Sequence, residues 1–202
     1  HDSFDLGGRR IEVTGPIDMA VAANQSTYEI RRVIRNGQVN VVPGANWDTD
    51  TQTSVASYDT GTPDQLTNVA NVANVAVGSL VEGTGVGREV YVTAKNLGAG
   101  TITLSQPFFG APASQTYTFK RFAYVLDFSG FTKLSKFTLT DVEIHCQGVA
   151  SGILLAPAGE TFHLKDSFVT KPLDRGVTSH GVGCQDLQID RCHFVSDEQA
   201  VA

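Results

Sequence analysis

Carboxyl, imidazole and guanidinium groups gather toward the end of this 202-residue chain. Asp174, Arg175 and His180 fall in the loop that we expect after Pro172. Four more such residues follow nearby in sequence: Asp190, His193, Asp197 and Glu198. Carboxyl and imidazole groups can act as general acids and bases, and all three types can hydrogen-bond a polar ligand. A catalytic role would fall to Asp174, His180, Asp197 and Glu198. The alternatives are a binding surface and a solvated turn.

A repeat indicates which elements position these side chains. Segments that begin at Lys136, Thr161 and Asp186 share one hydrophobic pattern at an unbroken 25-residue spacing. In register, they form three apolar columns: Phe137, Phe162 and Leu187; Leu139, Leu164 and Ile189; Ile144, Val169 and Phe194. Such a period is the mark of a solenoid, and alternation within each segment favours strands. We therefore predict an all-β fold, a right-handed parallel β-helix with coils of about 25 residues.

Other columns carry polar or small residues. Asp141, Asp166 and Arg191 should lie outside or at a turn, where Asp166 would form an ordinary ion pair with Arg191 in the next coil. Val142, Ser167 and Cys192 suit a narrow interior. Because successive coils lie about 4.8 Å apart, carboxylates from neighbouring coils could converge on one groove.

The register of the first coil has two solutions. Leu6 with Ile11, and Ile34 with Val39, repeat the separation of Leu139 and Ile144, and the two pairs lie 28 residues apart. Residues 4–8 also resemble residues 126–130, which implies a different register.

Composition narrows the classes of function. The formal net charge of −6 argues against a broad nucleic-acid footprint, which needs clustered lysine and arginine. No stretch approaches the roughly 18 apolar residues of a membrane span. The three cysteines read as buried thiols, with a disulfide or a metal site as the weaker alternatives. His145, His163 and His193 lack ligand spacing, so we expect neither a metal nor a cofactor.

The 25-residue pattern is absent from residues 43–121. Within this stretch we expect a short helix that begins at Pro63 with Thr62 as its cap. Two alternating strands, 88–94 and 101–105, predict a hairpin, and residues 115–121 alternate again. We therefore predict that residues 43–121 form a small β domain inserted between two coils.

The residue runs 80–87, 90–92 and 100–107 are similar to a small β module of phage structural and tail-fibre proteins. Residues 126–131 and 174–178 resemble coils of pectate-lyase-superfamily β-helices in phage tailspikes. The similarity is greatest to spike proteins of gene transfer agents, the phage-derived particles of Rhodobacter-like bacteria. This resemblance implies an extracellular role on the surface of a virion or phage-like particle. The implied partners are a host surface polysaccharide, such as a capsule, other virion structural proteins and, in a homotrimer, two further copies of the chain.

The resemblance also directs attention to sugar chemistry. Glycosidic cleavage generally needs two carboxyl groups across the bond. The Asn-Thr-Asp, Asp-Asp, Gly-His-Gly and Arg-Ile-Lys motifs of polygalacturonase-type β-helices are not intact: residues 48–50 resemble the first, and residues 179–181 match the third only in part. We expect carbohydrate-binding groups at Trp47, Tyr58, Arg175, Asp190 and His193. The rings of Trp47 and Tyr58 could stack on a sugar, or they could anchor the core of the insertion.

Together these patterns divide the chain into β-helix coils at 1–42, the inserted β domain at 43–121 and further coils at 122–202. We expect the coils to continue beyond the last residue, because the sequence stops inside one. Three functions stay open: an attachment spike, a polysaccharide hydrolase or lyase, and a structural connector of the particle.

Overall fold

The computed structural model describes residues 2–22 and 31–196. The chain divides into two compact units, one built from His1–Asp48 and Phe122–Ala202 and the other from Thr49–Arg121. The first unit contains β1 (Asp2–Val13), β2 (Ile17–Asp18), α1 (Met19–Ala22), β3 (Arg32–Val41), the 3-10 helix η1 (Ala45–Trp47), β10 (Tyr124–Asp127), β11 (Phe137–His145), β12 (Ser151–Leu154), β13 (Ala158–Lys165), β14 (Phe168–Thr170), β15 (Val177–Thr178), β16 (Gly183–Asp190) and β17 (His193–Val195). The second contains β4 (Asp50–Tyr58), β5 (Gln65–Thr67), β6 (Leu80–Glu82), β7 (Val92–Asn96), β8 (Thr101–Leu104) and β9 (Ser114–Arg121).

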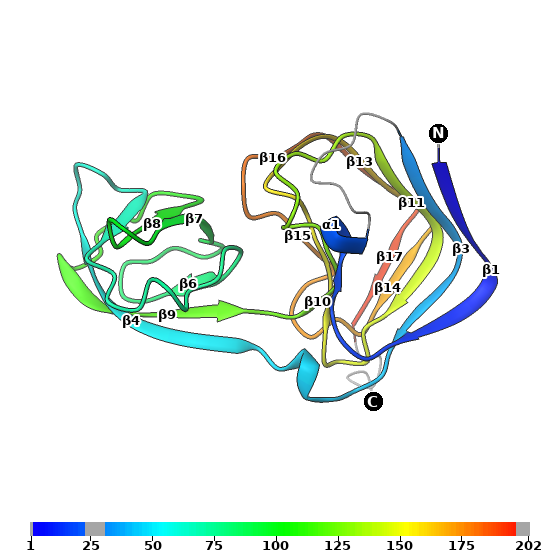
Figure 1. Cartoon of the computed structure of the whole chain (residues 1–202), viewed down its shortest axis with the longest axis horizontal. Helices are drawn as coiled ribbons and strands as arrows, with labels where there is room; N and C mark the ends of the chain where they lie inside the picture. Colours follow the sequence, from blue (N-terminus) through cyan, green and yellow to red (C-terminus); the bar gives the residue numbers. More distant parts are fainter. Residues whose placement is uncertain (1, 23–30, 197–202) are drawn as a thin grey trace. The chain divides into compact units, whose positions relative to one another are not determined.

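The first unit is a parallel β-helix. Its larger sheet has the order β1-β3-β11-β13-β16, with β14 beside β11 and β17 beside β14 (Figure 1). A second sheet has the order β15-β12-β10-β2. Phe137 pairs with Phe162, and Phe162 with Leu187, so neighbouring coils repeat at the 25-residue spacing of the sequence. The predicted all-β solenoid with an inserted β domain is confirmed.

The apolar columns form the interior of the β-helix. Phe137, Phe162, Leu139 and Leu164 are buried, and Phe128 packs edge-on against both phenylalanines, with ring centroids 4.9 and 5.4 Å away. Burial of these large rings removes apolar surface from water, which is the main favourable contribution to folding. In the last described coil the same columns, Leu187, Ile189 and Phe194, are exposed.

Each coil bends where a polar residue adopts the left-handed conformation. Asn36, Asp141, Asp166 and Arg191 have φ between 47° and 61° and occupy equivalent positions in four coils. Asn and Asp tolerate this conformation better than most residues. The bend divides β11 into a first half beside β13 and a second half beside β14. The predicted ion pair is present, because Nε of Arg191 lies 2.5 Å from Oδ1 of Asp166 in the preceding coil.

The first coil has one register in the structure. Ile11 pairs with Val39, as the 28-residue spacing predicts, but Phe4 rather than Leu6 pairs with Ile34. A bulge at Gly7 and Gly8, both with positive φ, shifts the strand between these points. Leu6 instead covers Gly37, where an added Cβ would lie 2.5 Å from the Leu6 Cβ.

The likeness between residues 4–8 and 126–130 does not reflect strand pairing, because Leu126 pairs with Ile17.

The second unit is one antiparallel sheet with the order β6-β9-β4-β5-β8-β7. The strands that come first and last in its sequence, β4 and β9, pair with each other, and Asp50 at the start of β4 lies opposite Arg121 at the end of β9. The predicted hairpin is confirmed as β7 and β8, and the strand expected at 115–121 is β9.

The prediction of a helix that begins at Pro63 is wrong. Gln65–Thr67 form β5, and turns follow. Asn68 has a φ of 51°, which ends any right-handed helix, and Asn and Val are poor helix formers. Val69 and Val75 are buried, six positions apart in sequence, so they do not follow helical spacing.

No helix within the described part of the chain is long and apolar enough to cross a membrane.

Candidate functional site

An exposed pair of aromatic rings marks the outward face of β14 and β17. Phe168 pairs with His193 in the next coil, and their rings stack with centroids 4.7 Å apart and planes 13° apart. The neighbouring Val169 faces the interior, so strand alternation directs Phe168 outward. Phe168 remains 44% exposed. The stack covers one face of each ring and leaves an exposed aromatic pair at the surface, which we call the aromatic platform.

Hydrogen-bonding side chains continue the same column into earlier coils. Glu143 of β11 pairs with Phe168, and Gln38 of β3 pairs with Glu143. Nε2 of Gln38 donates a hydrogen bond to Oε2 of Glu143 over 2.5 Å. This bond fixes an amide and a carboxylate beside the aromatic platform.

A parallel column adds a second set of polar groups. Asn40 pairs with His145, and His145 with Thr170. Nδ1 of His145 lies 3.0 Å from Oδ1 of Asn40, and Nε2 of Gln147 donates to the same oxygen over 3.0 Å. Asn40 is buried, so the array is held in place. We define the aromatic platform and these flanking groups as the aromatic face: Gln38, Asn40, Glu143, His145, Gln147, Phe168, Thr170 and His193.

The catalytic and binding residues predicted from the C-terminal part of the sequence do not form one cluster among the described residues. His193 belongs to the aromatic face, and Asp190 ends β16, where Arg191 Nη1 lies 2.5 Å from its Oδ2. Asp174 and Arg175 form an ion pair with each other in the turn after β14. His180 is buried. Asp197 and Glu198 lie outside the described residues.

The two aromatic residues predicted near the insertion are both buried. Trp47 is 1% exposed, belongs to the core of the β-helix unit, and donates from Nε1 to the carbonyl oxygen of Val42 over 3.0 Å. Tyr58 packs on Phe108 in the core of the second unit and donates from its hydroxyl to the Phe108 carbonyl oxygen over 3.1 Å. Both rings are therefore core residues: Tyr58 anchors the core of the insertion, as the second interpretation held, whereas Trp47 anchors the core of the β-helix.

Residues 43–48 cluster with the β-helix unit, although the sequence pattern placed them in the insertion. The physical reason is the burial of Trp47 against the β-helix core.

Sequence reasoning missed Phe168, Glu143 and Gln38. The signal was available, because positions 143, 168 and 193 each precede a member of the apolar column Ile144, Val169 and Phe194.

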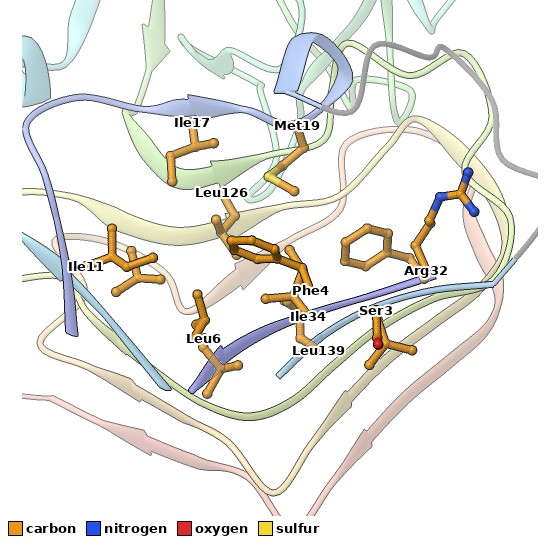
Figure 2. A pocket seen from close by; sticks show the side chains of 14 residues that line it. Ser3, Phe4, Leu6, Ile11, Ile17, Met19, Arg32, Ile34, Leu126 and Leu139 are labelled. Carbon is orange, nitrogen blue, oxygen red and sulfur yellow. The ribbon is translucent and has the colours of Figure 1, made fainter. Parts of the chain in front are cut away.

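An apolar cavity of about 500 Å³ lies inside the first coils of the β-helix. Ile17 and Met19 point into it from one side, and Leu6 and Ile34 from the other (Figure 2). Ser3 and Arg32 are the polar residues of its lining. A site with so few hydrogen-bonding groups does not suit a sugar.

Another cavity, of about 470 Å³, lies beside Tyr58 and Asp59 in the second unit. Asp59 is the one carboxylate among the residues that line these two cavities. Glycosidic cleavage generally needs two. Within residues 2–22 and 31–196, no group of three or more His, Cys, Asp and Glu side chains is placed to hold a metal ion.

The fold thus defines the class of this protein as a parallel β-solenoid with an inserted antiparallel sheet. No family model matches the chain, and no curated protein matches it. Among solved structures, it is similar to the Gp54 tailspike of Acinetobacter baumannii bacteriophage AP22, solved in complex with A. baumannii capsular saccharide. The identity is 9% and the TM-score 0.27, over 94% of this chain and 44% of that chain. The chain therefore spans less than half the length of that tailspike.

Proposed function

We propose that this chain is part of an attachment spike on a phage or phage-like particle and that its aromatic face binds a polysaccharide of the host surface. The observation that carries the proposal is the exposed stack of Phe168 on His193, flanked by fixed amide, imidazole and carboxylate groups. A pyranose offers an apolar face that stacks on an aromatic ring and hydroxyl groups that hydrogen-bond to such neighbours.

The solenoid itself also supports a polymeric ligand. Its coils present equivalent positions at a spacing of about 4.8 Å, so one surface carries rows of related side chains. A chain of repeating sugars can contact several coils at once. Many weak contacts then add up to useful avidity.

The sequence resemblance to spike proteins supports placement on the particle surface, where the chain would act extracellularly. It also supports homotrimers and contacts with other virion proteins. Sedimentation of the purified chain tests the trimer directly.

The aromatic face is tested with capsular polysaccharides purified from candidate hosts. Phe168→Ala should weaken binding about tenfold, because it removes the stacking platform and leaves the β-helix core untouched. Phe109→Ala is the matched control, since Phe109 is a 79% exposed phenylalanine of the second unit. Equal affinity of the Phe168→Ala variant and the wild-type chain would contradict this assignment.

The same assay separates attachment from cleavage. Reducing ends and unsaturated sugars are measured in parallel with binding. Saturable binding without products supports an attachment spike. If the wild-type chain releases such products and Asp174→Ala abolishes their release, the chain is an enzyme and the attachment proposal is contradicted.

A further inference from the structure

A small cavity with a basic lining lies on the outward side of β11 and β13. Its volume is about 220 Å³, and its lining consists of Arg31, Lys136, Thr138, Thr161, His163 and Lys165. Three of these six side chains carry a fixed positive charge, and none is acidic. This is a local excess of cations in a chain whose formal net charge is −6.

The strand register stacks two of the cations directly. Arg32 pairs with Phe137, so Arg31 and Lys136, which precede them, occupy equivalent positions in adjacent coils. The backbone N–H of Arg32 donates to the carbonyl oxygen of Lys136 over 3.0 Å, which holds the two segments together. Like charges at such opposed positions destabilise a sheet. A bound anion would remove this repulsion.

In another column of the same sheet, an arginine is paired with a carboxylate. Nε of Arg35 lies 3.0 Å from Oδ2 of Asp5 in the preceding coil. By contrast, the side chains of Arg31, Lys136 and Lys165 form no ion pair within the described part of the chain.

The acids at the rim of the cavity have other partners. Glu160 is bound by Lys133 over 2.7 Å. Oδ2 of Asp186 lies 3.3 Å from Nε2 of His163, and its Oδ1 accepts a hydrogen bond from Gln188. The hydrogen bonds from Lys133 to Glu160, and from His163 and Gln188 to Asp186, are the main reason that the pKa of each carboxyl lies below its usual range. The charges of Lys136 and Lys165 add smaller lowering effects on the pKa of Glu160 and of Asp186, respectively, but neither lysine forms an ion pair with these carboxylates.

We propose that this basic cavity binds an anionic group of the polysaccharide, which makes the ligand an acidic polysaccharide. The inference rests on the proposed function and names its substrate class. Lysine ammonium groups and threonine hydroxyls can donate hydrogen bonds to the oxygens of a carboxylate. A sulfate or phosphate substituent shares this chemistry. Lys165 and Phe168 lie on one segment of chain, so a single polymer can reach both the basic cavity and the aromatic face.

The test uses the intact chain and four polymers of defined charge. These are alginate, alginate with its carboxyl groups reduced to alcohols, dextran sulfate and dextran. The double variant Lys136→Gln with Lys165→Gln removes two cations of the cavity. Lys120→Gln with Arg88→Gln is the control, because it also removes two cations, both from the second unit, where Lys120 pairs with Glu82 and Arg88 is exposed.

We expect the wild-type chain to bind alginate and to bind reduced alginate about tenfold more weakly. The double variant should lose about tenfold in affinity for alginate and bind reduced alginate as the wild type does. The affinity for alginate should also fall as salt is added. Binding of dextran sulfate but not of alginate, lost in the double variant, would support the cavity and identify its anion as a sulfate or phosphate.

Two results separate this inference from the proposed function. Unchanged binding of all polymers by the double variant, with weaker binding by Phe168→Ala, overturns the basic cavity and supports the aromatic face. Weaker binding of alginate by the double variant, with unchanged binding by Phe168→Ala, supports the cavity and contradicts the aromatic face. If the wild-type chain binds neither alginate nor dextran sulfate, the assignment of an acidic ligand is overturned.

Discussion

At the scale of single residues, burial decides what each side chain can do. Trp47 and Phe168 are both aromatic, but Trp47 is buried and Phe168 is partly exposed. Their positions in the coils, and not their side-chain chemistry, account for this difference. Trp47 lies in the β-helix core, whereas Phe168 faces outward and stacks on His193. A sugar can therefore reach Phe168 and not Trp47.

The cysteines carry a testable consequence of burial. Desolvation raises the pKa of the buried Cys146 thiol to about 12. The thiolate is the reactive form, so at pH 8 the thiol of Cys146 is almost entirely protonated and unreactive. We expect a variant with Cys184→Ser and Cys192→Ser to react with a disulfide reagent at pH 8 only when unfolded.

The control for this experiment is the same variant in guanidinium chloride, where Cys146 should react at the rate of a free thiol. Rapid reaction of the folded protein would contradict the burial of Cys146.

At the scale of elements, the spacing of the coils depends on contacts between backbones. Gly152 of β12 lies against the next coil, and an added Cβ would be 2.2 Å from the carbonyl oxygen of Gly176 and 2.9 Å from Cγ1 of Val169. That space can open only if two adjacent coils move apart. Glycine at this position is therefore a requirement of the stack.

We expect Gly152→Ala to lower the free energy of unfolding by about 2 kcal/mol, because overpacking forces such shifts. Urea denaturation followed by circular dichroism measures the change. Gly44→Ala is the control: Gly44 has an extended φ of 172°, and an added Cβ would meet nothing within 4 Å. Equal stability of the two variants would show that the coils tolerate the side chain.

At the scale of the whole molecule, residues 2–22 and 31–196 contain two hydrophobic cores that have no residue in common. The β-helix core draws on residues before and after the insertion. The insertion begins and ends on β4 and β9, which pair at Asp50 and Arg121. Directly opposed residues of antiparallel strands lie about 5 Å apart, so a two-residue turn can join them.

Replacement of residues 51–120 by Asn-Gly should therefore leave a β-helix that unfolds cooperatively. Because the basic cavity and the aromatic face belong to the β-helix unit, the shortened chain should bind alginate with the affinity of the full chain. Circular dichroism and the polymer-binding assay check both expectations. A shortened chain that fails to fold would show that the β-helix requires the insertion.

The sequence by itself determined the solenoid, the 25-residue register of its later coils and the hairpin of the insertion. Each follows from apolar periodicity, which is a local property of the chain and is read without knowing which coil lies beside which. The sequence also predicted His193 as a binding residue; this stays a prediction, and the structure shows that the His193 ring stacks on Phe168. The sequence grouped Asp174, Arg175 and His180 because they are close together along the chain. In the structure Asp174 and Arg175 form an ion pair, whereas His180 is buried, so the three do not share a surface.

Only the tertiary structure decided which side chains meet. The bulge at Gly7 and Gly8 sets the first coil, and burial removes Trp47 from the surface. Parallel stacking brings Arg31 beside Lys136 across an insertion that separates them in sequence. The aromatic face likewise joins Gln38 to Glu143. Such contacts depend on how coils far apart along the chain come to lie side by side, and no local pattern of residues specifies that.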